Sequence, residues 1–329
     1  MVKYLLAYFY DVLNGGQLKF ANIPVFVTLY KVIEYVNPFF RPPSEGKSFI
    51  LQATIGCSHN SCTYCAMYRK EEQKFRVRPM EEIKSIIDTA TEAALIDDRV
   101  FIADGNALVL SKSKLIEIMD YLKDKNPGIE RIRMYANVGD ILRQGVPNLK
   151  ELKDHGLDMV YIGFESGDDI VLERIKKGAN HEETVKASKM LKEAGIMNSA
   201  MVLLGMGGTD RSLEHAEATG KLLTGADPEY VGALSLQVRP GAPLFDEMQR
   251  GEFELPNKFQ IIKELEVLVD NTELTDGYFF SNHISNYLPI KAKFPEDKEK
   301  VLSEIRAVLN SGDESLLRPD YYRDVINQY

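Results

Sequence analysis

Three cysteines, Cys57, Cys62 and Cys65, are the residues of this chain best suited to metal chemistry. They fall within nine residues of one another, and the 329-residue sequence holds no other cysteine. An odd, tightly clustered set is a poor basis for disulfide bonds, whereas several thiolates on one loop are typical metal ligands. Three thiolates can hold three irons of a cubane 4Fe–4S cluster and leave the fourth iron open for catalysis.

A structural zinc site is the main alternative for this loop, with His59 as the fourth ligand. Structural zinc sites commonly take their ligands from separated pairs, and here the cysteines crowd one loop without a second pair. The spacing therefore favours an iron–sulfur cluster over zinc.

Composition limits the class of protein. Hydrophobic residues make up 44% of the chain and charged residues 27%, which is enough to build a core and excludes a wholly disordered chain. The formal net charge of −9 argues against a general nucleic-acid binder. No apolar run is long enough to span a membrane, and the apolar start of the chain has no cleavage signal. We expect a cytoplasmic protein without a transmembrane segment.

Short apolar runs alternate with amphipathic helices between residues 46 and 245. The runs are apolar on both faces, as buried parallel strands are, and comprise Phe49–Thr54, Val100–Ala103, Ile132–Asn137, Met159–Phe164, Ser199–Leu204 and Val231–Val238. Helix signals lie between them, including a cap at Ser111 and a capping box formed by Asn180 and Glu183. Six β-α units predict an α/β fold, either a doubly wound sheet or a barrel.

The two ends of the chain lack the alternating strand and helix pattern of this central part. Residues 1–45 form an aromatic, apolar N-terminal extension in which Pro24–Val36 predicts a helix or strand. Residues 246–329 predict a helical C-terminal extension. Its expected helices cover Lys258–Asp270, Glu296–Leu309 and Pro319–Gln328, with a polar and aromatic loop at Tyr278–Pro289.

Polar and glycine-rich groups follow several of the predicted strands. Cys57 comes after the first strand, Asp104 and Gly105 after the second, and Glu165 with Ser166 after the fourth. In parallel α/β folds the strand ends on this side build the active site. We therefore expect one active site at the carboxyl ends of the strands.

At this point the sequence resembles the radical S-adenosylmethionine (radical SAM) superfamily. Members carry a Cys-x3-Cys-x2-Cys loop after the first strand, with an aromatic residue before the last cysteine, where this chain has Tyr64. Here the first gap is four residues, so the loop must absorb one extra residue. The resemblance covers residues 46–245 and implies a partial (β/α)6 TIM-like barrel. It also implies a 4Fe–4S cluster held by the three cysteines, and S-adenosylmethionine as the second cofactor.

The resemblance extends to residues expected to contact S-adenosylmethionine. They are Tyr64, Asp104, Gly105, Glu165, Ser166, Lys177, Met201, Leu203 and Val238. In the family, the position of Glu165 binds the ribose hydroxyls, and Lys177 replaces an arginine that binds the methionine carboxylate. Met201, Leu203 and Val238 match adenosine contacts.

The implied activity is reductive cleavage of S-adenosylmethionine, followed by hydrogen abstraction from a small or lipid-like substrate. A reductant such as flavodoxin or ferredoxin would supply the electron. On the substrate side, His283 and Arg239 are candidate catalytic or anion-binding residues. Two other functions stay open: a tRNA-modifying radical SAM enzyme, although the acidic charge makes nucleic acid unlikely as a partner, and a non-catalytic iron–sulfur or zinc scaffold.

Overall fold

The computed structural model describes residues 33–321. Most of the predicted Pro24–Val36 element lies outside this range, and its described part, Ile33–Val36, contains neither helix nor strand. Most of the predicted Pro319–Gln328 helix likewise lies outside the described residues. Within the described range, no helix is both long and apolar enough to cross a bilayer.

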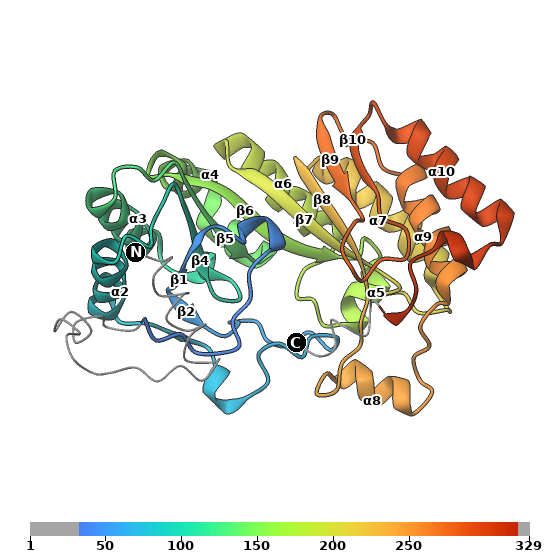
Figure 1. The fold of residues 1–329 in the computed structure, drawn as a ribbon, viewed down its shortest axis with the longest axis horizontal. Coiled ribbons are helices and arrows are strands. Elements are labelled where there is room, and N and C mark those ends of the chain that lie inside the picture. Colours follow the sequence, from blue (N-terminus) through green and yellow to red (C-terminus); the bar gives the residue numbers. More distant parts are fainter. Residues whose placement is uncertain (1–32, 322–329) are drawn as a thin grey trace, which may run out of the picture. The chain divides into compact units, whose positions relative to one another are not determined.

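The core of the fold is a sheet of eight strands in the linear order β1-β4-β5-β6-β7-β8-β9-β10 (Figure 1). The first six run parallel to their neighbours. They are β1 (Phe49–Gln52), β4 (Arg99–Ala103), β5 (Arg131–Ala136), β6 (Leu157–Glu165), β7 (Met197–Leu204) and β8 (Tyr230–Ser235). All six predicted strands are present, which confirms the α/β class. The order is linear rather than circular, so the sheet is a partial barrel.

Helices connect the parallel strands, as the sequence predicts. They are α2 (Met80–Glu92), α3 (Lys112–Lys125), α4 (Val138–Asp154), α5 (Asp169–Arg174), α6 (His181–Ala194) and α7 (Ser212–Ala226). The Ser111 cap and the capping box of Asn180 and Glu183 are both formed. Helix α4 is bent at Gly145, whose φ is 72°, and Pro147 opens its second half.

Short elements flank the first strands. A small antiparallel pair joins β2 (Thr54–Ile55) to β3 (Arg76–Val77), and the predicted metal loop lies between these two strands. Single 3₁₀ turns cover η2 (Pro43–Glu45), η3 (Glu71–Gln73) and η4 (Ala107–Val109). The cysteine loop is thus anchored at both ends by β structure.

The C-terminal part contains helices, as expected of the helical extension, and also two short strands that were not predicted. Its elements are α8 (Pro243–Gln249), α9 (Lys258–Asp270), β9 (Gly277–Phe280), β10 (Lys291–Phe294), α10 (Lys298–Ser311) and η5 (Glu314–Leu316). The α9 prediction is confirmed. The predicted loop at Tyr278–Pro289 begins within β9, which extends the sheet by pairing parallel to β8. A strand of four residues is too short to give a clear alternating pattern.

The two faces of the sheet are distinguished by alternate residues. In β7, Asn198, Ala200, Val202 and Leu204 are buried beneath the helices, and the Asn198 amide donates to Ser188 of α6 at 3.1 Å. Met197, Ser199, Met201 and Leu203 point to the opposite face and are only partly buried. We call this opposite face the inner face.

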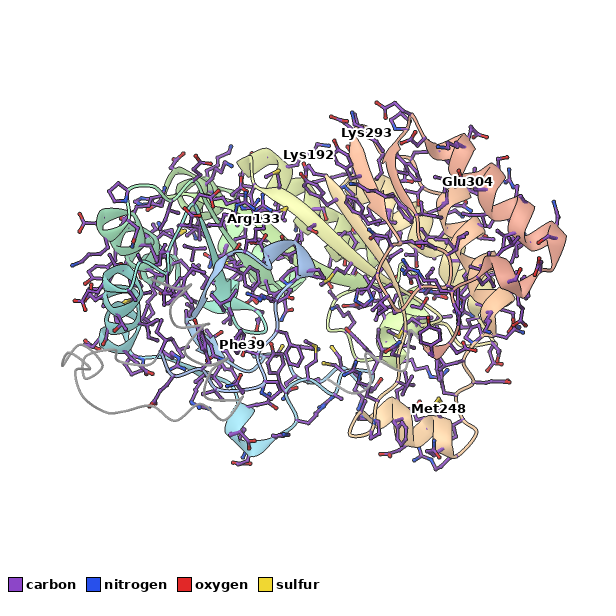
Figure 2. All side chains as sticks on the ribbon, in the orientation of Figure 1. Phe39, Arg133, Lys192, Met248, Lys293 and Glu304 are labelled. Atoms are coloured by element: carbon purple, nitrogen blue, oxygen red, sulfur yellow. The ribbon has the colours of Figure 1, made fainter. Side chains whose placement is uncertain are left out.

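The segment before β1 covers the inner face at β5 and β6. The Tyr161 hydroxyl donates to Glu45 at 2.5 Å, and the Arg133 guanidinium donates to the same carboxylate at 3.3 Å. The rings of Phe39 and Tyr35 pack with centroids 4.7 Å apart (Phe39 and Arg133 are labelled in Figure 2). Because Glu45 is fully buried, its bonds to Tyr161 and Arg133 are needed to compensate for its desolvation.

Candidate active site

The cysteine loop follows β2, on the side of the sheet where the parallel strands end. It starts at Gly56, whose φ is 72° and whose position would put a Cβ atom 2.1 Å from the Gln73 carbonyl oxygen, so only glycine fits. Cys57, Cys62 and Cys65 are all free and half-buried. Burial raises the pKa of Cys65 to about 11, and the nearby Cys62 and Cys57 thiols add to that rise. The three thiols are therefore close enough to interact.

Arg69 holds this loop together, and the sequence reasoning missed it. Its guanidinium donates to the carbonyls of Cys65 at 2.9 Å, Asn60 at 3.0 Å and Cys62 at 2.6 Å. A planar guanidinium with several donors is well suited to bind three backbone oxygens at once. The available signal was an arginine four residues after the last cysteine.

The loop also docks on the connection between α5 and α6. The Thr63 amide donates to the Ile175 carbonyl at 2.9 Å, and the His59 Nε2 lies 2.8 Å from the Lys176 carbonyl. Gly178 packs under the His59 ring, where a Cβ atom would come within 2.5 Å of Cε1. His59 thus helps to hold the cysteine loop in place. The α5–α6 connection that it contacts also contains Lys177.

Glu165 reaches this place because β6 bulges at its end. Glu165 has φ 65°, and the register between β6 and β7 shifts between Gly163 and Glu165. Its side chain folds back over Gly163, where a Cβ atom would lie 1.9 Å from Glu165 Oε1. The Lys177 ammonium donates to the same Oε1 at 3.0 Å. Burial lowers the pKa of Lys177, but the Glu165 carboxylate and the Cys62 and Cys57 thiols together outweigh it, so the pKa of Lys177 is raised.

Tyr64 connects the cysteines to this ion pair. Burial raises the pKa of Tyr64 well above the usual value, and the nearby Glu165 carboxylate and the Cys62 and Cys65 thiols add to that rise. Tyr64 also packs into one apolar cluster together with Leu203 and Val238. The structure therefore brings together Tyr64, Glu165, Lys177, Leu203 and Val238 beside the cysteine loop.

Asp104 lies next to the start of the loop but is held by other side chains. It is 1% exposed, accepts from Gln52 at 3.1 Å and from the Tyr68 hydroxyl, and also binds the backbone of Gly105 and Gly56. Burial raises the pKa of Asp104 although these hydrogen bonds lower it. This carboxyl anchors the loop, and its predicted cofactor contact stays a prediction.

Gly105 allows the second strand end to approach the loop closely. A Cβ atom there would lie 2.7 Å from both Cα and Cβ of Cys57, and 2.8 Å from the Gly56 carbonyl. The glycine predicted for the cofactor turn is thus also required for packing against the first cysteine.

Ser166 turns away from the loop towards α7. His215 Nε2 lies 3.0 Å from the Leu203 carbonyl and must donate to it, so Nδ1 accepts from the Ser166 hydroxyl at 2.8 Å. Both side chains are fully buried, and burial lowers the pKa of His215 to about 4. The Ser166 side chain supports the strand end, and a cofactor contact through its backbone stays a prediction.

The remaining candidates lie further along the chain. Met201 lies on the inner face of β7, between Gly163 and Gly232 in the sheet register. Arg239 begins the turn into α8, where its carbonyl accepts from Ala242 at 3.1 Å. His283 Nδ1 accepts from the Ser285 hydroxyl at 2.8 Å within the β9–β10 loop. The proposed catalytic roles of Arg239 and His283 stay predictions.

A cavity of about 240 Å³ opens beside the cysteine loop. It is lined by Ser58, His59, Asn137, Val138, Gly139, Asp140, Lys177, Gly178 and Ala179. In Figure 1 the light-blue loop after β2, α5 and α8 all lie below the strands. By its lining residues, the cavity lies between the cysteine loop, the start of α4 just after β5, and the α5–α6 connection.

The donor set can be compared with the ligands that a metal ion or an iron–sulfur cluster requires. Within residues 33–321, no three side chains of histidine, cysteine, aspartate or glutamate converge closely enough to bind one metal ion. A cubane requires less convergence, because each thiolate binds its own iron at a separate corner. Three half-buried thiols on one loop supply the number and type of ligands that such a cluster takes from a protein.

Comparison with known proteins defines the class. The sequence profile of the Radical SAM superfamily matches residues 51–223, which is more than half of the chain. The chain belongs to this superfamily, whose members use a 4Fe–4S cluster together with S-adenosylmethionine.

Curated relatives have diverse functions. The chain is 24% identical over 226 residues to the heme chaperone HemW of Bacillus subtilis, covering 66% of this chain and 58% of that protein. It is 24% identical over 268 residues to the anaerobic magnesium-protoporphyrin IX monomethyl ester cyclase of Rubrivivax gelatinosus, covering 79% of this chain and 47% of that protein. The chain thus spans about half the length of these relatives.

Solved structures support the fold. The cobalamin-dependent S-adenosylmethionine radical enzyme OxsB matches with a TM-score of 0.51 at 16% identity, covering 68% of this chain and 41% of that one. The radical S-adenosylmethionine methyltransferase TsrM of Kitasatospora setae matches with a TM-score of 0.50 at 19% identity, covering 63% and 39%. These similarities concern the fold alone.

Proposed function

We propose that this enzyme holds its cluster through Cys57, Cys62 and Cys65 and removes a hydrogen atom from a small or lipid-like substrate. The observation that carries the proposal is that three half-buried thiols share one loop with Tyr64, beside the Glu165–Lys177 ion pair. When bound, the cluster and S-adenosylmethionine supply one-electron cleavage of a carbon–sulfur bond, with an external reductant as the electron source.

The chain's own residues would orient S-adenosylmethionine through opposite charges. The Glu165 carboxylate retains free acceptor capacity besides its bond to Lys177, which suits the ribose hydroxyls. Lys177 lines the cavity and carries a positive charge that suits the methionine carboxylate. Leu203 and Val238 present the apolar surface expected against an adenine ring.

Anaerobic reconstitution with iron and sulfide tests this proposal. We expect about four irons per chain and formation of 5′-deoxyadenosine that depends on dithionite. The Cys62→Ala variant should lose both, since it removes one of three ligands. One tightly bound zinc per chain, with no cleavage of S-adenosylmethionine, would reject the proposal.

A matched control separates ligand loss from damage to the loop. Ser61 neighbours Cys62, is exposed, and its hydroxyl only donates to the His59 carbonyl at 2.9 Å. Ser61→Ala should retain iron and cleavage activity. If Cys62→Ala keeps S-adenosylmethionine binding but unfolds more easily, the loop has a scaffold role instead.

A further inference from the structure

The segment that follows the last cysteine presents two apolar side chains to solvent. We call Met67–Arg76 the post-cysteine segment, and it begins two residues after Cys65. Met67 and Phe75 are each 38% exposed. Single exposed apolar residues are common on protein surfaces, whereas two on one short segment beside a candidate redox site are typical of a contact surface.

Other side chains of the post-cysteine segment point inward and fix its position. Tyr68 is 5% exposed and Gln73 is 2% exposed. The Tyr68 hydroxyl donates to the buried Asp104 carboxylate, and the Gln73 side-chain amide donates to the Pro38 carbonyl at 3.0 Å. Because these inward bonds hold the segment, its outward side chains form a surface that is already in place before a partner binds.

The post-cysteine segment is basic in a chain that is acidic as a whole. It has four basic and two acidic side chains, a net charge of +2 against −9 for the whole sequence. Lys74 and Glu71 form an ion pair at 2.6 Å. Arg69, Lys70 and Arg76 are exposed and have no carboxylate within 4.0 Å among residues 33–321. The two guanidiniums donate only to neutral carbonyl oxygens, so their positive charges are not neutralised.

This surface adjoins the proposed cluster ligands. Arg69 donates to the carbonyls of Cys65 at 2.9 Å and Cys62 at 2.6 Å. The α5–α6 connection, which touches the same loop through His59, adds the exposed Lys176. A protein bound to the post-cysteine segment would therefore lie next to the half-buried thiols.

The chemistry of the site indicates which partner this surface suits. The proposed function needs an electron from outside, and the donor must bind close to the thiols because electron transfer slows steeply with distance. Redox encounters between proteins use small interfaces, and opposite charges speed their formation. Two apolar side chains flanked by a few positive charges fit an acidic protein. A nucleic acid would need a larger basic surface, which the net charge of −9 disfavours.

We propose that the post-cysteine segment is the docking surface for an acidic protein that carries one electron at a time. The reduced carrier would pass one electron to the cluster, so the carrier is oxidised by one electron, the cluster is reduced by one, and no atom is transferred. This inference rests on the proposed function for its redox step, but docking itself is measured by binding alone.

The test measures binding of two acidic one-electron carriers, a purified flavodoxin and a plant-type ferredoxin, to the immobilised full chain. Biolayer interferometry is run at about 0.05 M and about 0.5 M salt, between which the screening length falls from about 14 Å to about 4 Å. We expect saturable binding of a carrier at the lower salt concentration, with affinity at least about fivefold weaker at the higher one.

Charge-reversal variants locate the binding. The double variant Lys70→Glu/Arg76→Glu should weaken carrier binding at least about tenfold at the lower salt concentration. Lys189→Glu/Lys291→Glu is the matched control, because it changes the net charge equally. Its two lysines are exposed, lie in α6 and β10, and have no carboxylate within 4.0 Å in the described part of the chain. This control should change binding by less than about threefold.

Two single variants complete the set. Lys70→Glu alone should weaken binding several-fold, and it replaces the double variant if the latter does not fold. Phe75→Ser should weaken binding several-fold at both salt concentrations, because the contact that it removes carries no charge.

A cleavage assay with two reductants separates docking from chemistry. Dithionite is small and needs no docking surface, so 5′-deoxyadenosine formation with dithionite should be equal in reconstituted wild type and the double variant. Formation driven by the reduced carrier should fall at least about fivefold in the double variant.

The outcomes separate this inference from the proposed function. No saturable binding of either carrier, or equal losses in the double variant and the control pair, would overturn the inference. Binding of total tRNA that the double variant loses, with carrier binding unchanged, would assign the surface to nucleic acid and also overturn it. Absence of dithionite-driven cleavage in wild type would reject the proposed function without affecting the binding result.

Discussion

Asp104 and Glu165 are acidic residues at the ends of two parallel strands, yet the structure uses them differently. Asp104 is buried and receives hydrogen bonds from Gln52 and Tyr68 as well as backbone groups of the cysteine loop. Glu165 has one charged partner, Lys177, which lines a cavity. Both residues therefore lie at strand ends, but they differ in the number of internal hydrogen-bond partners. Asp104 anchors the cysteine loop, whereas Glu165 is a candidate for binding a ligand.

The difference shows which carboxylate is satisfied by hydrogen bonds within the protein and which can still accept hydrogen bonds from a ligand. The Asp104 side of the site is closed by internal hydrogen bonds, which fix where the loop starts. The Glu165 side keeps acceptor capacity and an adjacent cavity, as a binding residue must. The variants below are arranged to contradict or sharpen this distinction.

The largest expected effect is on stability, in Asp104→Ala. This variant leaves the buried Tyr68 hydroxyl, the Gln52 amide and backbone donors without their acceptor. Because each such group costs about 1–3 kcal/mol, we expect the free energy of unfolding to fall by about 3–5 kcal/mol in urea denaturation. Asp104→Asn, which keeps an acceptor and the shape, should lose clearly less. Equal, small losses in both would contradict the anchor role.

The next effect concerns affinity, in Glu165→Gln. Loss of the carboxylate should weaken S-adenosylmethionine binding by about 2–3 kcal/mol, since hydrogen bonds to charged groups contribute that much. Equilibrium dialysis with the reconstituted protein measures it. Asp104→Asn should change the same affinity by less than about 1 kcal/mol. If Asp104→Asn has the larger effect on binding, the two assignments are reversed.

A third effect is a pH dependence of stability from His215, which supports the Glu165 strand end. Its folded pKa is lowered to about 4 by burial, against a usual value near 6.5. Below pH 6.5 the unfolded chain gains a proton that the folded chain cannot accept, so stability falls as the pH drops towards 4. We expect a contribution of about 2 kcal/mol between pH 7 and pH 5, at 1.36 kcal/mol per pH unit.

Urea unfolding at the two pH values, in wild type and His215→Gln, isolates that contribution. The glutamine amide can still donate to the Leu203 carbonyl but does not titrate. The loss of stability between pH 7 and pH 5 should therefore be smaller in the variant, and an equal loss would show that His215 is not the group responsible.

The smallest expected effect is in Lys177→Arg. The charge is kept, but the longer guanidinium must re-form its bond to Glu165 beside the Cys62 thiol. We expect S-adenosylmethionine binding to change by no more than about 1 kcal/mol, whereas Lys177→Met should lose clearly more. Equal affinity in wild type and Lys177→Met would remove Lys177 from the binding site.

Sequence reasoning located the strands and the loop because both depend on local patterns. Apolar runs and helix caps are visible within a few residues, and the cysteines are fixed by their spacing. What it missed depends on how the chain folds. The Asp104 partners Gln52 and Tyr68 lie 52 and 36 residues away in the chain. The Arg69 bonds are local, but they form only once the cysteine loop has curled round so that three of its carbonyls face one guanidinium.

Strand β9 and the orientation of Ser166 were missed for the same reason. Four residues of β9 become a strand because β8 provides a neighbouring edge, and its residues alone give too short an alternation. Ser166 follows Glu165 directly, but the bulge in β6 turns the serine towards His215. Adjacent residues of one motif therefore need not share a role.

The linear strand order has a consequence for the size of molecule the enzyme can accept. A closed barrel of strands would limit a bound molecule to the space inside the barrel. Here β1 and β10 are the two ends of the order and do not pair within residues 33–321. In an open order, the lateral limits of a site at the strand ends must come from the segments beside β1 and β10 rather than from the sheet itself.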